Sequence, residues 1–249
     1  MPVVHDAEFL LIDNSNSFTK IAVATRARLL SVRKLPTASL TTADLRRAIA
    51  RWRFARAVLS SVVPRKKEEI CRALRGVPIV HVSSRIELGV ALDYPKPSTI
   101  GADRLANAAI AAASIGGPVV VVDFGTAVSF DVVSKENAYV GGVIAPGLAA
   151  MTEYMHARTA LLPKITLQEP CSAIGKSTRG AMLAGAIHGY RGLVRQILVE
   201  IARELGVGKR LRVVATGGYA ELIAHGLPEI QSVQPNLTLE GLRLIGSLN

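Results

Sequence analysis

Two segments of this 249-residue chain follow the same pattern of residues. In residues 10–17, and again in residues 120–127, an apolar run ends in an aspartate and is followed by small or hydroxyl-bearing residues. A second apolar run then begins, as is typical of a β-strand, a tight polar turn and a returning strand. The carboxylates of Asp13 and Asp123 can face a cation there, and the small residues let backbone N–H groups approach an anion such as phosphate. The pattern predicts two similar lobes that hold a metal–nucleotide between them.

The rest of the chain alternates between strand-like and helix-like segments, which predicts an α/β fold. Its hydrophobic content is 49% and its mean hydropathy +0.32, so we expect a substantial core. An alanine-rich helix is expected at residues 102–113. Residues 114–118 then form a turn-rich segment, and we place the lobe boundary in it. The first lobe is expected over residues 1–116 and the second over residues 117–249. The sequence leaves open whether the last helix, residues 237–248, returns to the first lobe.

The formal net charge of +11 favours anionic partners. Many basic residues lie in residues 26–75 and 191–212, where they interrupt amphipathic helix-like segments. Solvated helix faces explain this pattern better than a nucleic-acid surface, because no stacking aromatics or recognisable binding module accompany the charges. We therefore expect small anionic ligands and no nucleic-acid partner.

The cysteines and apolar segments predict the compartment. Cys71 and Cys171 stand in unrelated contexts, so neither a disulfide framework nor a cysteine metal site is expected. The N-terminal segment carries the acids Asp6 and Glu8 and lacks the apolar core of a signal peptide. No uninterrupted apolar stretch approaches the ~20 residues of a membrane helix. These features predict a soluble cytoplasmic protein without a membrane segment.

The ordered motifs of the chain resemble those of the type III pantothenate kinases over nearly its whole length. That family belongs to the superfamily of acetate and sugar kinases, Hsp70 ATPases and actin. The matching motifs are residues 13–17 (DNSNS), Tyr94 with Pro97, residues 101–104 (GADR), 123–127 (DFGTA), 141–147 (GGVIAPG), 159–163 (TALLP), Ser177-Thr178 before Ala181-Met182, and 216–218 (TGG). The resemblance implies two ribonuclease-H-like (actin-like ATPase) α/β lobes with a nucleotide cleft between them.

The resemblance also implies an activity. It is ATP-dependent phosphorylation of pantothenate to 4′-phosphopantothenate, the first step of coenzyme A biosynthesis. Phosphoryl transfer depends on positioning and charge neutralisation more than on covalent chemistry. ATP, Mg²⁺ and a monovalent cation (K⁺ or NH₄⁺) are the implied cofactors, and pantothenate and ATP the substrates. A homodimer with the pantothenate pocket near its interface is implied as well.

The first motif is assigned to ATP and Mg²⁺. Asp13 would hold Mg²⁺ through water, since Mg²⁺ keeps several waters. Taken alone, Asp13 could equally cap a turn, and Lys20 could face solvent. The family has glycine where this chain has Ser15, which we interpret as a modification of the turn and not as its loss. The residues expected to contact ATP are Asp13, Asn14, Ser15, Asn16, Ser17, Phe18, Thr19, Lys20 and Thr126.

Asp103 is the candidate catalytic base, because a carboxylate can accept the proton of a primary alcohol. Its position at the start of a helix should keep it ionised. The expected pantothenate contacts are Tyr94, Gly101, Ala102, Asp103, Arg104 and Thr178. Tyr94 could instead be a packing residue, and the hydroxyl of Thr178 could be a helix N-cap. Asp123 matches the position that binds the monovalent cation in the family.

Two other functions remain open from the sequence. Some relatives of this family are described as transcriptional accessory factors, so a nucleotide-binding regulator with little kinase activity is one alternative. The positive charge and Ser15 favour it weakly, whereas Asp103, Arg104 and Asp123 argue against it. The other is a kinase of the same superfamily that acts on a different small hydroxy acid.

Overall fold

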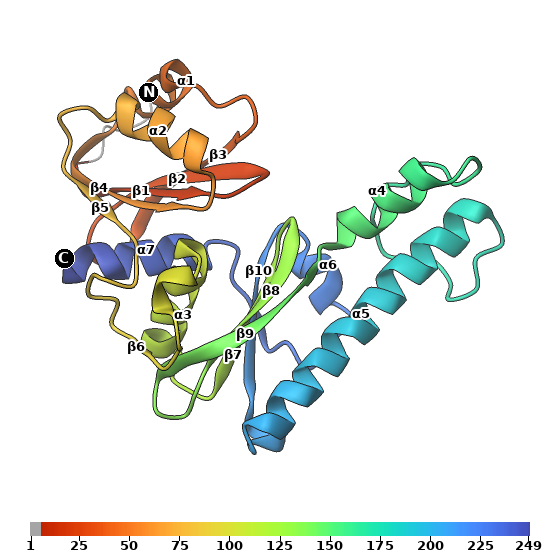
Figure 1. Ribbon diagram of the computed structural model, residues 1–249. Coiled ribbons are helices and arrows are strands. Elements are labelled where there is room, and N and C mark those ends of the chain that lie inside the picture. The colour runs from red at the N-terminus through yellow and green to blue at the C-terminus, as the bar shows by residue number, and fades with distance from the viewer. Residues whose placement is uncertain (1–5) are drawn as a thin grey trace. The chain divides into compact units, whose positions relative to one another are not determined.

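The computed structural model describes residues 6–249, so residues 1–5 of the expected first lobe lie outside the described part. Contacts divide the chain into two compact units. The first contains the N-terminal segment to Gly116, together with residues 137–140 and 236–249. The second contains residues 117–136 and 141–235. Each unit is built around its own β-sheet (Figure 1).

The first unit has a five-stranded sheet in the order β3-β2-β1-β4-β5. Its central strand β1 is antiparallel to β2 and parallel to β4, which is in turn parallel to β5. Residues 9–12 of β1 are buried, as expected for a strand covered on both faces. The strands are β1 (Asp6–Asn14), β2 (Phe18–Ala24), β3 (Leu29–Pro36), β4 (Arg53–Ser61) and β5 (Ile79–His81).

Helices cover this sheet. They are α1 (Thr42–Ile49), α2 (Pro64–Ala73), the 3₁₀ helix η1 (Pro97–Thr99), α3 (Ala102–Ser114) and α7 (Leu237–Leu248). Thr41 caps α1 with a capping box to Asp44, as its sequence predicts. The last helix α7 packs against α3, β1 and β4, and the hydroxyl of Thr238 donates a 2.9 Å hydrogen bond to Asn107 Oδ1 (Figure 1). Residues from the end of the chain therefore complete the first unit.

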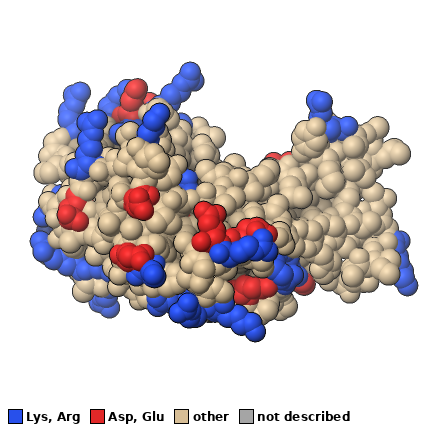
Figure 2. All heavy atoms as spheres, turned by 60° about the horizontal axis from the view of Figure 1, so that its bottom comes forward, with Lys and Arg blue, Asp and Glu red and all other residues tan. Residues whose placement is uncertain are grey.

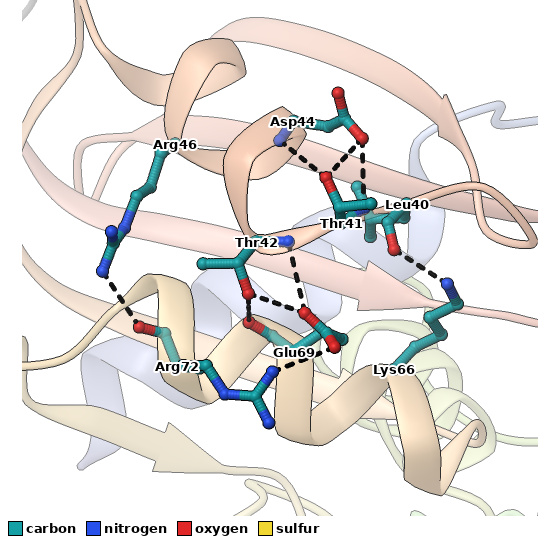
Figure 3. Close-up of polar contacts among 8 residues, drawn as sticks. All are labelled: Leu40, Thr41, Thr42, Asp44, Arg46, Lys66, Glu69 and Arg72. Carbon is teal, nitrogen blue, oxygen red and sulfur yellow. Dashed lines mark hydrogen bonds and ion pairs between the residues drawn. The ribbon is translucent and has the colours of Figure 1, made fainter.

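Polar side chains join α1 to α2 (Figure 3). The hydroxyl of Thr42 donates a 2.6 Å hydrogen bond to Glu69 Oε2, and Lys66 Nζ donates to the carbonyl of Leu40 at 2.8 Å. Lys66 belongs to a basic run that the sequence places on a solvated helix face. Its ammonium instead holds the loop before α1, while neighbouring Arg65 is exposed. In the view of Figure 2, Lys and Arg are scattered in small groups with Asp and Glu between them.

The second unit has a sheet in the order β11-β10-β7-β8-β9. Its strands are β7 (Val119–Phe124), β8 (Ala127–Val133), β9 (Ala138–Pro146), β10 (Arg212–Gly217) and β11 (Ser232–Val233). Its helices are α4 (Leu148–Arg158), α5 (Thr178–Glu204), the 3₁₀ helix η2 (Gly208–Arg210) and α6 (Ala220–Ala224). The first residues of β9 belong to the first unit, where they pair with the short strand β6 (Ala91–Leu92).

The two sheets share one topology. In each, the central strand is antiparallel to the strand that follows it in sequence and parallel to a strand that comes later, β4 beside β1 and β10 beside β7. The predicted repeat of an aspartate turn is thus a repeat of a whole sheet. None of the helices within residues 6–249 is long and apolar enough to cross a membrane.

One buried arginine organises the second unit. Arg191 of α5 makes two hydrogen bonds, of 2.8 and 2.7 Å, with the carboxylate of Glu169. Its guanidinium also donates to the carbonyls of Leu222 and Ile223, at 2.7 and 3.2 Å. Arg191 therefore ties the irregular segment before α5, and the end of α6, to the long helix.

Candidate active site

Asp13 lies at the end of β1, directly opposite Ser60 of the parallel strand β4. Register partners on neighbouring strands project from the same face of a sheet. The Oγ atom of Ser60 is buried and has no hydrogen-bond partner among the described residues. Asp13 is itself only 6% exposed, and its Oδ1 accepts a 3.2 Å hydrogen bond from the hydroxyl of Ser15. A carboxylate and a buried hydroxyl thus lie on neighbouring strands, on the same face of this end of the sheet.

The turn between β1 and β2 has an exposed tip and a buried base. Ser15 is partly exposed and Asn16 and Ser17 are exposed, whereas Asn14 and Thr19 below them are 1% and 0% exposed. The side-chain amide of Asn14 donates a hydrogen bond to Thr19 and accepts one from Ser61, so it supports the turn from inside the protein. Phe18 is 41% exposed, and the ammonium of Lys34 lies over its ring. Lys20 is the register partner of Asp13 on the neighbouring strand of the hairpin.

Ser15 needs no glycine-like conformation. Within residues 6–249, Asn137 is the only non-glycine residue with a positive φ. The serine that replaces the family's glycine therefore fits the turn without backbone strain, and its hydroxyl is directed to Asp13.

Asp103 lies in the first turn of α3, and Gly101 is the residue before that helix. Its Oδ1 accepts a 2.8 Å hydrogen bond from the backbone N–H of Arg104 and lies 2.6 Å from where a Cβ of residue 101 would stand. Only glycine leaves room for the carboxylate in this rotamer. Burial raises the pKa of Asp103, and the hydrogen bond and positive charge of Arg104 oppose that shift less strongly. The helix N-terminus, which we expected to favour the ionised form, is thus outweighed by burial.

Arg104 lies against the ring of Tyr139, which in turn contacts the ring of Tyr94. Its Cζ lies 5.8 Å from the ring centroid of Tyr139, and Tyr139 contacts the ring of Tyr94 at 6.0 Å. The backbone N–H of Asp93 donates a 2.9 Å hydrogen bond to the carbonyl of Tyr139, which fixes the segment that carries Tyr94. Sequence reasoning missed Tyr139, which lies far from Tyr94 in sequence but beside it in the fold.

Val62 connects the aspartate turn to the segment that carries Asp103. The backbone N–H of Val62 donates a 3.1 Å hydrogen bond to the carbonyl of Asn14, and Val62 Cγ1 lies 3.7 Å from the position of a Cβ at residue 101. The end of β4 therefore contacts both segments. Val62 thus links Asn14 and residue 101, which are far apart in sequence.

The second aspartate turn repeats the first. Asp123, the second-to-last residue of β7, lies opposite Thr216 of the parallel strand β10. The buried Oγ1 of Thr216 has no hydrogen-bond partner among the described residues. Gly217 follows with φ +94, and a Cβ there would lie 2.6 Å from Asp123 Oδ1. The carboxylate therefore lies directly against backbone at residue 217. Neither Ser60 nor Thr216 stood out as a cation ligand in the sequence, although each follows an apolar run.

The remaining candidates of the second unit are more exposed. Thr126 is exposed in the turn after Asp123, and its carbonyl accepts a 3.2 Å hydrogen bond from Gly147, which caps α4. Thr178 is the exposed first residue of α5, where it leaves its hydroxyl available. The N-cap is Ser177, whose hydroxyl accepts a 3.1 Å hydrogen bond from the N–H of Gly180, so the N-cap alternative for Thr178 was wrong.

These oxygen atoms suit hard cations that keep part of their water shell. Within residues 6–249, no three His, Cys, Asp or Glu side chains gather into a cluster that could enclose a metal ion. Mg²⁺ bound beside nucleotide phosphates requires only one or two carboxylates. The pairs Asp13 with Ser60 and Asp123 with Thr216 offer a carboxylate beside a buried hydroxyl, which fits such partial coordination.

Comparison with known proteins shows which family the sequence matches. The family model for type III pantothenate kinase matches residues 9–200. A protein of that name from Akkermansia muciniphila is 51% identical over 242 residues, which cover 97% of this chain and 99% of the relative.

Two solved structures show the same fold. A candidate Baf family transcriptional activator from Campylobacter jejuni has a TM-score of 0.62 at 18% identity, covering 95% of this chain and 96% of that one. A candidate 2-dehydro-3-deoxygalactonokinase from Sinorhizobium meliloti has a TM-score of 0.60 at 13% identity, with 96% of both chains covered. The chain therefore shares the two-sheet α/β fold of these structures. On the match of its sequence over nearly its full length, the chain belongs to the type III pantothenate kinase family.

Proposed function

We propose that this chain phosphorylates pantothenate with ATP, as its family name implies, and that Asp103 is the base. The observation that carries the assignment of the base is the environment of the Asp103 carboxylate. Burial raises its pKa toward the range in which a carboxylate accepts a proton effectively, and Gly101 leaves it room at the start of α3. Its Oδ1 is held by the N–H of Arg104, so Oδ2 is the oxygen offered to the substrate hydroxyl.

Arg104 binds the pantothenate carboxylate in this proposal. A guanidinium can pair with a carboxylate through two parallel hydrogen bonds. The ring of Tyr139 lies against the guanidinium and fixes its direction. Tyr94, Gly101 and Ala102 complete the wall of the pocket. Thr178, which is exposed, is a further substrate contact that the family motif implies.

Each aspartate turn would bind nucleotide phosphate and a cation. Residues 16–18 offer backbone N–H groups to the phosphates, whereas the N–H of Ser15 is bonded to the carbonyl of Phe18. Thr126 offers the same from the second turn. Asp13 with Ser60 would hold Mg²⁺ through water, and Asp123 with Thr216 would hold a monovalent cation. When bound, these cations neutralise the charge that develops on the transferred phosphoryl group.

Exposed apolar side chains in the second unit support a homodimer. They are Ile144 at 62% exposed, Tyr154 at 65%, Leu161 at 89% and Ile174 at 79%. Large apolar side chains exposed in this way mark interaction surfaces when they lie together. All four lie on β9, on α4 or in the irregular segment before α5. We propose that a second copy of the chain covers them.

A regulator without kinase activity is not favoured. The relatives that match this chain over nearly its full length carry the name of a kinase, and Asp103, Arg104 and Asp123 are all present. The likeness to a candidate transcriptional activator stands at 18% identity and indicates a shared fold only.

The deciding experiment measures ADP formation from Mg-ATP with and without pantothenate, and with and without K⁺. We expect turnover that requires pantothenate, increases with K⁺ and falls by about 10²-fold or more in Asp103→Asn. Arg56→Gln, a change in strand β4 outside the proposed site, is the matched control and should keep wild-type rates. Pantothenate-independent ATP hydrolysis, or full activity in Asp103→Asn, would contradict the assignment.

A further inference from the structure

Four side chains form a continuous chain of hydrogen bonds behind the first aspartate turn. Ser61 Oγ lies 2.7 Å from Asn14 Oδ1, and Asn14 Nδ2 lies 2.9 Å from Thr19 Oγ1. Thr19 Oγ1 lies 2.9 Å from Thr37 Oγ1, which is 2.7 Å from the carbonyl oxygen of Ser15. Asn14, Thr19 and Thr37 are each at most 2% exposed. We call Ser61, Asn14, Thr19 and Thr37 the hydroxyl relay.

Chemistry fixes the direction of every bond in the hydroxyl relay. A carbonyl oxygen can only accept, so Thr37 donates its single hydroxyl hydrogen to Ser15. Thr37 must then accept from Thr19, which spends its own hydrogen in that bond. Thr19 in turn accepts from the amide NH₂ of Asn14, whose oxygen accepts from Ser61. All donors therefore point from the end of β4 toward the turn, and such aligned bonds polarise one another.

Thr37 holds the turn at two points. Besides its hydroxyl bond to the Ser15 carbonyl, its backbone N–H donates a 3.0 Å hydrogen bond to the carbonyl of Ser17. In a planar trans peptide, the carbonyl and the N–H of the next residue point in opposite directions. Because both carbonyls face Thr37, the N–H groups of Asn16 and Phe18 face away from it.

This arrangement gives the turn an electrostatic polarity. Carbonyl oxygens carry partial negative charge and would repel a phosphate, whereas N–H groups attract one. Thr37 turns the carbonyls inward and leaves N–H groups on the opposite side. We infer that Thr37, through the hydroxyl relay, is a positioning residue that sets the anion affinity of residues 16–18. The inference rests on the proposed function, in which those residues bind the nucleotide phosphates.

The test compares Thr37→Val with Thr37→Ser. Valine keeps the shape and the backbone N–H but loses the hydroxyl, whereas serine keeps the donor. We expect Thr37→Val to weaken Mg-ADP binding, measured by titration calorimetry, and to raise KM for ATP by about fivefold to tenfold, the factor expected for one buried hydrogen bond. KM for pantothenate should stay within about twofold on the same reasoning. Thr37→Ser should restore both nucleotide values.

Thr42→Val is the matched control. It also removes a threonine hydroxyl that bonds to another side chain, Glu69, but it lies at the junction of α1 and α2. It should lower thermal stability without changing Mg-ADP affinity. Wild-type Mg-ADP affinity in Thr37→Val would overturn the inference, even if that variant melts at a lower temperature.

Two further readouts keep the outcomes distinct. If the wild type binds Mg-ADP but shows no pantothenate-dependent turnover, the proposed function fails, and the binding data still decide whether Thr37 positions the turn. If Thr37→Val does not fold, Ser61→Ala decides. This change removes the first donor without altering Thr37, and unchanged Mg-ADP affinity would then reject the inference. A loss of about twofold to threefold would support it.

Discussion

The backbone N–H of Arg104 donates a 2.8 Å hydrogen bond to the carboxylate of Asp103, the residue before it. This bond and the positive charge of Arg104 favour the ionised carboxylate, but burial acts more strongly and raises its pKa. One residue pair thus contains both the proposed base and the group that limits how far its pKa can rise. The balance between them has measurable consequences.

The first consequence is a pH dependence of the reaction. Asp103 can accept a proton only when it is ionised, so kcat/KM should rise with pH through a pKa above the ordinary 3.8 of an aspartate. Arg104→Gln removes the opposing positive charge and should move this limb to higher pH. A pH–rate profile from about pH 4 to pH 9 measures both. A flat profile in the wild type would contradict the role of Asp103.

The second consequence concerns stability. A carboxyl whose folded-state pKa is raised stabilises the protein below its unfolded pKa of about 3.8, and that contribution is lost as pH rises through the folded value. Asparagine is neutral throughout, so Asp103→Asn should unfold at a higher denaturant concentration than the wild type at pH 7, while losing activity. Urea titrations at about pH 4 and pH 7 test this. A less stable variant at pH 7 would contradict the raised pKa.

The stack of Arg104 on Tyr139 should matter for pantothenate binding. Tyr139→Leu removes the aromatic face, worth about 0.5–1 kcal/mol to a cation, so KM for pantothenate should rise by about twofold to fivefold. Tyr139→Phe keeps the ring and serves as the control. KM for ATP should not change in either variant. Equal effects of leucine and phenylalanine would show that the ring does not position Arg104.

The hydroxyl of Thr216 should lower the stability of the protein while it contributes to cation binding. It is buried without a hydrogen-bond partner among the described residues, so Thr216→Val should raise the free energy of unfolding by about 1 kcal/mol. The same change should increase the K⁺ concentration needed for half-maximal activity. Thermal unfolding and a K⁺ titration of the rate measure the two effects. An unchanged K⁺ requirement would remove Thr216 from the cation site.

Arg191 and Arg195 lie on the same helix but should differ in importance. The side chain of Arg191 is 8% exposed and bonds to Glu169 and two carbonyls, whereas that of Arg195 is 47% exposed and pairs with Glu229. Arg191→Met should therefore cost about 2–3 kcal/mol in urea unfolding, because it leaves buried carbonyls without donors. Arg195→Met should cost less than about 1 kcal/mol. If the two variants lost similar amounts of unfolding free energy, Arg191 would not join the segment before α5 and the end of α6 to the long helix.

The sequence predicts the strands and turns of this fold well because their signals are local. Apolar runs that end in aspartate mark β1 and β7, and Thr41 with Asp44 marks the start of α1. The long helix α5 begins at Thr178, because the hydroxyl of Ser177 caps it. The two-residue strands β6 and β11 are too short to leave a periodic signal.

The site was harder to predict where it depends on contacts between distant segments. Ser60 and Thr216 become candidates only through their register opposite Asp13 and Asp123. Tyr139 reaches Arg104 because Ala138 and Tyr139 pair with β6. The pKa of Asp103 depends on burial, which no motif contains, so the sequence does not predict that this pKa is raised.

The position of α7 has a consequence for how the protein is made. This helix packs on β1, α3 and β4, yet it is synthesised after every other helix and strand of the two units. Domains generally fold as units during synthesis, with the N-terminal one first. Here the second unit has all of its residues before α7 exists, so the unit that begins the chain is the last to be completed. Until then, the apolar surface of β1 and α3 that α7 will cover stays exposed to chaperones.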